Sequence, residues 1–486
     1  MSNRSFRTLF LIEMWERFGF YSMASLMVVF MINGLHFDDQ HANLTWGAIA
    51  ALIYITPVLG GWLGDRVLGT RRTMLLGVAV LLIGYVLLAL PMNGQTDLFL
   101  SLSVVIIGGG LFKPTAGNMV RLIYKNEPHR LDSAFTLYYM AVNIGGTVSM
   151  LLAPYLKEKY GWHAAFALCA LGMVMAILQA ILASKYLKNL GTALDNQPFK
   201  WKRFFGVIIG TLVLIAVMMP ILMDPSVAKI CVVVIAIVTA LLLLYMIFKA
   251  KSGERKGLIV ACILILEMVL FMIFYQQMTT SLTLFALRNV DNHFTFFGLH
   301  LFTFSAPQYM SLNGIWIFVL SPLLAWIYNK YDHKAGNASV AQKYALGFAA
   351  VALGFGIFTL SGNFAVDGKI SSWFMVAGYG FYSLGELLVN GLGMSMISKF
   401  APPTLSATLM GVYFLAAGIA QYMGSIVANL AKMPHDVVLS AQQTLPLYIN
   451  LFKTLTWMAI AGLIVALILL PLINRLIRAH AVTTSA

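Results

Sequence analysis

Between residues 61 and 72 the chain reads Gly61-Trp62-Leu63-Gly64-Asp65-Arg66-Val67-Leu68-Gly69-Thr70-Arg71-Arg72. Four of these twelve residues are charged, whereas charged residues make up only 10% of the whole chain. Apolar runs lie on both sides, at about 44–65 and 73–91. Each is close to the roughly 20 residues that an α-helix needs to cross the hydrocarbon core of a bilayer. The stretch therefore predicts a charged loop that joins two membrane-spanning helices.

The composition extends this interpretation to the whole chain. Of its 486 residues 60% are hydrophobic, and a soluble domain would need roughly 25% charged residues to cover its surface. The formal net charge of +14 would favour nucleic acid as a partner of a soluble protein. In a membrane protein the same excess is expected from Lys and Arg in cytoplasmic loops, so we predict membrane lipid and no nucleic acid among the partners.

The apolar runs predict an all-α membrane protein with about fourteen transmembrane helices. The first six span approximately 8–34, 44–65, 73–91, 97–122, 133–156 and 163–187; two more span 204–222 and 227–248; the last six span 258–287, 309–329, 343–361, 371–399, 405–431 and 446–474. This order predicts three parts. They are a six-helix bundle at 1–190, a linker with two additional helices at 191–256, and a second six-helix bundle at 257–486.

The distribution of Lys and Arg predicts the orientation. About 23 of the 32 basic residues fall on one side of the membrane on this threading, which marks that side, and both termini, as cytoplasmic. Charges at positions 13, 16 and 17 interrupt the first apolar run, so we expect no cleavable signal peptide. The three cysteines lie in apolar runs without a CxxC pair, and they predict helix packing and no metal site.

Six helices, an inserted hairpin and six more helices resemble the major facilitator transporters, in which two bundles enclose a site at the bilayer midplane. The stretch 61–72 is similar to the G-x-x-x-D-R-x-x-G-x-R-R loop of that superfamily. We expect Asp65, with Arg66, to act as a conformational latch, by capping a helix N-terminus in the other half or by pairing with a basic residue. The alternative is an ordinary basic loop that contains one acid.

The first helix carries a charged stripe. Glu13, Glu16, Arg17 and Tyr21 fall within a sector about 140° wide. A charged side chain at the bilayer centre costs roughly 2.5–3.5 kcal/mol, so the stripe needs partners or water. Glu13 and Arg17 are four residues apart, which favours an ion pair. The alternative, that these side chains extend to the membrane surface, explains Glu13 better than it explains the whole stripe.

Two further charges lie deep in apolar helices. Lys113 follows Gly108-Gly109-Gly110-Leu111-Phe112 and precedes Pro114, well away from either end of its helix. It must point into a cavity or meet an acid, and Glu386 is the best candidate for that acid. Asn390 lies four residues after Glu386 and shares its helix face. Lys113 and Glu386 suit a charge pair across a cavity between the two bundles.

Softer polar residues accompany these charges: Tyr54, Tyr139, Asn143, Gln276, Gln277 and Asn313. Each alone is more often an interhelical hydrogen bond than a ligand contact. Their value is that they occur where a cavity is already expected. Glu267 either lines that cavity or lies at the membrane interface.

Several of these residues lie in motifs of a known family. The run Glu13-Met14-Trp15-Glu16-Arg17-Phe18-Gly19-Phe20-Tyr21 resembles the E-x-x-E-R-F-x-x-Y motif of the proton-dependent oligopeptide transporters, the POT/PTR family. Further matches follow in order, at Gly110-Leu111-Phe112-Lys113, at 135–145, at 277–282 and at Gly385-Glu386-Leu387. The resemblance covers essentially the whole chain and looks closest to bacterial di- and tripeptide permeases.

The resemblance implies a symporter that imports di- and tripeptides across the bacterial inner membrane, driven by the proton gradient and without a cofactor. It implies that Glu13, Glu16 and Arg17 form the proton-coupling group. The substrate-binding residues that it implies are Tyr21, Tyr54, Lys113, Tyr139, Asn143, Gln276, Asn313, Glu386 and Asn390. Among them Lys113 with Tyr54 would receive the peptide carboxylate, and Glu386 with the two asparagines 143 and 313 would receive the amine. We expect a single chain to be functional as a monomer.

Two positions depart from the family pattern. Many members carry a second arginine seven residues after the motif arginine, where this chain has Ala24, and a glutamate where it has Gln276. These two charges often pair in the family, and losing both together avoids leaving one buried charge unpaired. We expect a gate that closes with fewer charges than in many relatives.

Two rival functions remain open. One is a facilitator of another small solute, such as a peptidomimetic, a drug, nitrate or an amino acid derivative. The other is an intramembrane enzyme, which would need a nucleophile with its base or a metal cluster. The chain contains no HExxH, GxSxG or Walker A motif, and its nine histidines are scattered, so we predict that it is not an enzyme.

Overall fold

The computed structural model describes residues 2–484 except 93, 128–129, 189, 336–338, 401–404 and 434–438. Within the helices, side chains are not described at 2, 132, 252–253, 328–335, 390–399, 406–407 and 478–484. The chain forms two compact units. The first contains Met1–Phe37 and Ala48–Cys231, and the second contains Asp38–Gly47 and Val232–Ala486. The first residues of one helix therefore belong to the second unit.

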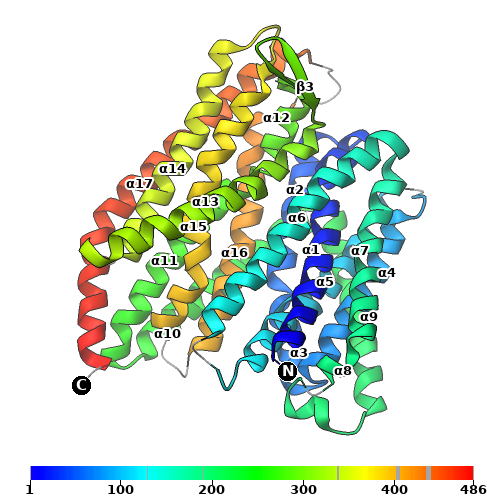
Figure 1. Ribbon diagram of the computed structural model, residues 1–486, viewed down its shortest axis with the longest axis vertical. Helices are drawn as coiled ribbons and strands as arrows, with labels where there is room; N and C mark the ends of the chain where they lie inside the picture. The colour runs from blue at the N-terminus through cyan, green and yellow to red at the C-terminus, as the bar shows by residue number, and fades with distance from the viewer. Residues whose placement is uncertain are drawn as a thin grey trace. The chain divides into compact units, whose positions relative to one another are not determined.

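The helices of the first unit follow one another with short connections (Figure 1). They are α1 (Ser2–Asn33), most of α2 (Asp39–Ile55), α3 (Pro57–Arg66), α4 (Thr70–Ala89), α5 (Gln95–Ile123), α6 (Leu131–Tyr160), α7 (Trp162–Leu182), α8 (Ser184–Leu187), the 3-10 helix η2 (Ala193–Asn196) and α9 (Trp201–Met223). α1 packs on α6 and α7, α4 packs on α5 and α7, and α3 packs on α5. α9 packs on α5 at the edge of this unit.

The second unit contains the remaining long helices and a few short elements. They are α10 (Pro225–Lys249), α11 (Ser252–Gln276), α12 (Ser281–Asn289), η3 (Ala306–Met310), α13 (Ser311–Ala335), α14 (Val340–Ser361), η4 (Gly362–Phe364), α15 (Ser372–Phe400), α16 (Ser406–Ala428), η5 (Asn429–Ala431) and α17 (Ala441–Thr484). α14 packs on α15 and α17, and α11 packs on α15, α16 and α17. The unit boundary falls inside α10, so α9 groups with the first unit and most of α10 with the second.

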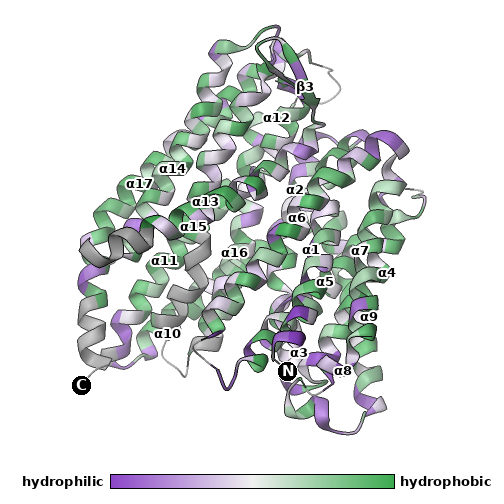
Figure 2. Ribbon diagram, viewed as in Figure 1, coloured by the Kyte–Doolittle hydropathy of each residue, from purple (hydrophilic) through white to green (hydrophobic). Residues whose placement is uncertain are grey.

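The helices have the length and the surface of membrane spans. In the described part of the chain, twelve are long and apolar enough to cross a bilayer. Two more long helices, the charged α1 with 32 residues and α15 with 29, complete the predicted set of about fourteen. Figure 2 shows hydrophobic residues along most of the helix surfaces. Large apolar side chains such as Ile209 and Ile468 are exposed, as expected where a protein faces hydrocarbon. The prediction of an all-α membrane protein is confirmed.

Two of the predicted spans are each broken into two helices. The span predicted at 44–65 divides into α2 and α3 because Pro57, which has no N–H to donate, starts a new helix. The span predicted at 258–287 divides into α11 and α12, with residues 277–280 between them. Broken helices are tolerated inside a membrane only where neighbouring groups satisfy the freed backbone.

A small β structure was not predicted. β2 (His293–Phe296) and β3 (Leu299–Thr303) form an antiparallel hairpin, whose turn residues Phe297 and Gly298 have φ values of 47° and 80°. This two-residue turn with positive φ at both positions suits a hairpin. β1 (Val290–Asp291) also pairs with β4 (Ile370–Ser371) in parallel. Both pairs lie between helices, and they leave the helical fold class unchanged.

Candidate functional site

A buried ion cluster lies on α1 in the first unit. The Arg17 guanidinium donates from Nε to Oε2 of Glu16 at 2.5 Å and from Nη2 to Oε1 at 2.7 Å. Its Nε is also 3.5 Å from Oε1 of Glu13. The predicted pair between Glu13 and Arg17 is therefore present, but the closer, two-point contact is with Glu16. All three side chains are buried, so they do not extend to a surface.

The neighbouring helix α6 adds a tyrosine to this cluster. The hydroxyl of Tyr138 donates to Oε2 of Glu13 at 2.5 Å. Sequence reasoning selected Tyr139, which is 40% exposed. The structure shows which face of α6 meets α1 at Gly145, where an added Cβ would come within 2.2 Å of the Met14 carbonyl oxygen on α1. Tyr138 lies seven residues, or about two turns, before this close contact, so it shares the face of α6 that meets α1.

Lys113 on α5 lies beside Tyr54 on α2. The Nζ atom is 4.7 Å from the centre of the Tyr54 ring, within the range of a cation–π interaction. α5 approaches this region closely through Gly110, where an added Cβ would come within 2.6 Å of Thr56. Lys113 also interacts electrostatically with the charges of the α1 cluster. The structure thus brings together Lys113 and Tyr54, which the sequence paired, and places both near the ion cluster.

Two other predicted residues lie where α1 meets α6. The ring of Tyr21 faces Gly146, where an added Cβ would come within 2.9 Å of it. Asn143 donates from Nδ2 to the carbonyl oxygen of Tyr139 at 2.9 Å, one turn earlier in the same helix. That bond does not use the amide oxygen of Asn143. The first unit thus gathers its predicted site residues on α1, α2, α5 and α6.

The second unit holds its own polar centre between α13 and α15. Asn313 donates from Nδ2 to Oε2 of Glu386 at 2.7 Å and to Oγ of Ser383 at 3.1 Å. Glu386 is only 4% exposed. The structure therefore brings together Glu386 and Asn313, as predicted. Asn390 falls in the part of α15 whose side chains lie outside the described residues.

The glutamines at the end of α11 act in helix packing. Gln276 donates to Oγ of Ser425 on α16 at 2.9 Å. Gln277 donates to the Gly424 carbonyl oxygen at 2.9 Å and accepts a bond from Ser281 at 2.6 Å. These bonds link α11, α12 and α16 across the break at 277–280. For Gln276 this is the interhelical hydrogen bond that the sequence left open as an alternative to ligand binding.

Glu267 lies earlier on α11 and differs from every other buried acid described so far. Its side chain is buried, with 6% of its surface exposed. Among the described residues, neither of its carboxylate oxygens has a hydrogen-bond partner. Within the same described part, no group of three or more His, Cys, Asp or Glu side chains could hold a metal ion.

The charged loop 61–72 makes a contact that the sequence did not predict. Asp195, in η2 of the linker, accepts hydrogen bonds from the backbone N–H groups of Arg71 at 3.2 Å and Arg72 at 3.1 Å. Its carboxylate therefore caps the N-terminus of α4, where a negative charge is favoured. Asp65 was expected to cap a helix in the other half or to pair with a basic residue. Among the described residues of the first unit it accepts a 3.5 Å bond from Asn118, and Arg66 is exposed.

A second unpredicted ion pair lies in the second unit. Arg288 on α12 binds Asp39, the first residue of α2, through two bonds of 2.7 Å. The same guanidinium donates to the hydroxyl of Tyr448 on α17 at 2.7 Å. This part of α2 belongs to the second unit, which also holds it by the 2.7 Å bond from Trp46 to Thr279. The residues Ala24 and Gln276, which replace the charges common in the family, take no part in it.

Long apolar helices in two units, with buried charged residues well inside them, define a multi-pass membrane transporter of the major facilitator kind. Residues 71–458 match the profile described as PTR2, POT family, and the chain belongs to that family. The chain is 35% identical to dipeptide and tripeptide permease B of Salmonella typhimurium over 476 residues, covering 98% of this chain and 96% of the permease. It is 36% identical to the permease B of Xenorhabdus bovienii over 479 residues, with coverages of 98% and 96%.

A solved structure agrees with these relatives. The crystal structure of tetrameric PepTSo2 matches with a TM-score of 0.89 and 48% identity, covering 98% of this chain and 100% of that chain. The family resemblance and the fold that it implied are thus confirmed. The roles of individual residues stay predictions.

Proposed function

We propose that this chain imports di- and tripeptides across the bacterial cytoplasmic membrane as a proton-coupled symporter that works by alternating access. The names of its relatives and its membership of the family support this function. One observation carries it: a lysine with a tyrosine in one unit, and a glutamate with an asparagine in the other. In this proposal the chain is not an enzyme and needs no cofactor, because the proton gradient supplies the energy.

The two polar centres suit the two ends of a peptide. A zwitterionic dipeptide offers a carboxylate at one end and an ammonium group at the other, whatever its side chains are. Lys113 can bind the carboxylate through a charge-assisted hydrogen bond, with the Tyr54 ring holding the ammonium group of Lys113 in place. Glu386 can accept a bond from the peptide ammonium while Asn313 fixes its position. Tyr21, Tyr139, Asn143, Gln276 and Asn390 complete the proposed binding set.

The cluster of Glu13, Glu16 and Arg17 is the proposed coupling group. Two carboxylates share one guanidinium, so one negative charge is left in excess in a buried setting. Binding a proton removes that excess, and the low dielectric makes the change energetically large. Lys113 interacts electrostatically with this cluster. Protonation of the cluster can therefore change how strongly Lys113 binds the peptide carboxylate. One proton moving through 100 mV supplies about 2.3 kcal/mol, or roughly a fiftyfold concentration ratio.

The orientation and assembly are part of the same proposal. The Lys and Arg distribution supports both termini in the cytoplasm. Asp65 and Arg66, both exposed in the first unit, remain free to act as the conformational latch that the loop motif implies. Every residue of the proposed site comes from one chain, so we propose that the monomer transports. The tetrameric state of the related crystal structure is compatible with four independent sites.

Uptake of labelled dialanine into proteoliposomes tests the function. We expect accumulation when the outside is made acidic and the inside negative, and only equilibration when an ionophore collapses the gradient. Absence of uptake for dialanine and for several other di- and tripeptides would overturn peptide transport. Uptake that is indifferent to the ionophore would overturn proton coupling and leave a peptide facilitator.

A second candidate keeps the transport mechanism and changes the solute. One solved relative, at 27% identity and a TM-score of 0.82, is a peptide transporter in complex with alafosfalin. Peptidomimetics that keep both charged ends should therefore be compared directly with dialanine as substrates. Competition of dialanine uptake by such compounds, but not by nitrate or single amino acids, would favour peptides and their mimics over an unrelated solute.

A further inference from the structure

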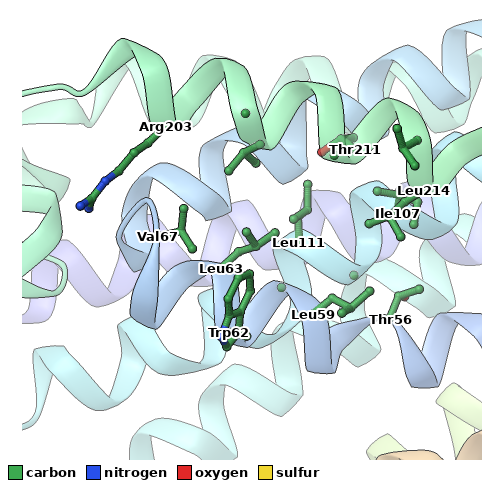
Figure 3. A pocket seen from close by; sticks show the side chains of 16 residues that line it. Thr56, Leu59, Trp62, Leu63, Val67, Ile107, Leu111, Arg203, Thr211 and Leu214 are labelled. Carbon is green, nitrogen blue, oxygen red and sulfur yellow. The ribbon is translucent and has the colours of Figure 1, made fainter.

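A groove lies between α9 and the helices α3 and α5 of the first unit, and none of its lining residues belongs to the proposed transport site. It has a volume of about 530 Å³ and is lined by sixteen residues of α3, α5, α9 and their flanks. Figure 3 shows Arg203 of α9 at one end of the groove. At the other end Leu214 of α9 lies beside Ile107 of α5. All side chains named here belong to the first unit. No step of the proposed transport mechanism uses this groove.

Glycines and apolar side chains shape the groove. On α9, Gly206 and Gly210 line it, and a Cβ added at either would meet nothing within 4 Å. The opposite wall includes Leu59, Leu63 and Trp62, whose ring is 59% exposed at the rim. The space therefore exists because α9 lacks side chains along this strip. Its lining would suit a hydrocarbon chain and would bind a polar solute poorly.

The length of the groove matches one leaflet of a bilayer. From Arg203 to Leu214 is eleven residues, which at 1.5 Å per residue is about 16 Å along α9. That is close to half of a hydrocarbon core about 30 Å thick. Phe199, Trp201, Phe204 and Phe205 cluster at the N-terminal end of α9, and Trp201 is 63% exposed. Such an aromatic group is typical of the level where lipid headgroups begin.

Positive charge is concentrated at that same end. Between 184 and 203 the chain has five basic residues and one acid, Asp195, whose carboxylate is occupied in capping α4. Arg203 lines the groove and also a smaller depression beside it that includes Arg72 and Lys200. Within the described part of the chain, no acidic side chain pairs with Arg203. Basic pockets of this kind between helices suit anionic headgroups.

We propose that this groove binds one acyl chain of an anionic phospholipid, with its phosphate at Arg203 and Lys200. By the predicted orientation this lipid belongs to the cytoplasmic leaflet. The bound chain fills the strip between α9 and α3, and so holds the inserted helix against the bundle. A second copy of the protein is the competing occupant. It fits less well, because a protein surface there would have to cover an unpaired arginine.

Native mass spectrometry of the purified protein, supplied with equimolar phosphatidylglycerol and phosphatidylethanolamine, tests the proposal. We expect one phosphatidylglycerol to be retained by the unaltered chain. Gly210→Leu should fill the groove without a backbone clash, and Arg203→Gln should remove the headgroup charge. Each should lower the retained fraction at least fivefold.

Matched controls separate the groove from general effects. Gly356→Leu on α14 adds the same side chain where a Cβ also meets nothing within 4 Å. Lys202→Gln removes a basic residue next to Arg203 that does not line the groove. Both should retain the lipid. Equal retention by Gly210→Leu and the unaltered chain, or no preference for phosphatidylglycerol, would overturn the proposal. A loss of oligomers rather than of lipid in Gly210→Leu would overturn it in favour of a second copy.

A second measurement needs no groove-filling variant. Brominated phosphatidylglycerol should quench the fluorescence of Trp62 more than brominated phosphatidylethanolamine does. The difference should disappear in Trp62→Phe, which leaves the other eight tryptophans in place. Equal quenching by both lipids in the unaltered chain would contradict an anionic lipid in the groove.

Discussion

The buried acids of the two proposed sites, Glu13 and Glu16 in the first unit and Glu386 in the second, have different partners. In the first unit Glu13 and Glu16 share the guanidinium of Arg17, and Tyr138 donates a further bond to Glu13. In the second unit, among the described residues, the partner of Glu386 is the neutral amide of Asn313, which also donates to Ser383. An ionised carboxylate without a cation is costly to bury. The cluster of Glu13, Glu16 and Arg17 therefore contains its own counter-charge, whereas Glu386 is stabilised by a proton or by an incoming cation.

This contrast divides the work between the units. A cluster that carries its own arginine can gain or lose a proton and remain partly compensated in both states. An acid held by neutral amides needs a proton or a substrate ammonium group to be compensated. We therefore assign coupling to the first cluster and amine recognition to Glu386, and four substitutions test that division.

The largest effect is expected from Glu16→Gln. It removes one carboxylate of the cluster, so the excess negative charge that attracts the proton is lost. Accumulation should fall from roughly fiftyfold at 100 mV to equality with the outside, while exchange of labelled for unlabelled dipeptide continues. Glu158→Gln, which alters an exposed carboxylate, is the control. Undiminished accumulation in Glu16→Gln would contradict the assignment of proton coupling to the cluster of the first unit.

Glu386→Gln should weaken peptide binding by about tenfold to a hundredfold, since hydrogen bonds to charged groups contribute roughly 1.5–3 kcal/mol. The loss should be confined to peptides with a free amine. Competition assays with dialanine and N-acetyl dialanine measure it. If both compounds lose affinity equally, Glu386 does not receive the amine.

Lys113→Ala should cost about tenfold in affinity for peptides with a free carboxylate, through loss of one charge-assisted hydrogen bond. C-terminal amides should be affected less. Lys113→Arg serves as the partner variant, because it keeps the charge but changes the geometry. Equal losses for acids and amides in Lys113→Ala would contradict its assignment to the carboxylate.

The smallest effect is expected from Tyr138→Phe. It deletes one hydrogen bond to Glu13, which is worth roughly 1 kcal/mol, and so should reduce proton-driven uptake about fivefold. Tyr155→Phe, on the same helix α6 and 50% exposed, should have no effect on uptake at the same proton gradient. Equal uptake by Tyr138→Phe and the unaltered chain would contradict a role for Tyr138 in the cluster.

The sequence was sufficient for features that are local along the chain. Runs of about twenty apolar residues located the helices, and the spacing of Glu13, Glu16 and Arg17 located the cluster. Lys113 and Tyr54 were brought together through a family motif. The β2–β3 hairpin has a local signal too, two β-prone runs separated by Phe297-Gly298, but a search for long apolar runs passes over it.

Contacts between distant segments could not be predicted in this way. Asp39 and Arg288 are 249 residues apart, and each alone is an ordinary charge near the end of a helix. No prediction was made for Asp195 from the sequence, since its role depends on where η2 folds back onto α4. The choice between Tyr138 and Tyr139 required the face on which α6 meets α1 to be known.

The bond from Asp195 to the start of α4 bears on how the protein can be divided into separately expressed fragments. A division at residue 190, where the sequence alone places the end of the first bundle, would leave Asp195 on the wrong fragment. The first fragment would then carry an uncapped α4, and the Arg72 side chain would lose the carbonyls of Leu194 and Gln197 that it also binds. A division at Asp224, between α9 and α10, keeps Asp195 and α9 with the first unit and leaves α10 with the second, to which most of it belongs.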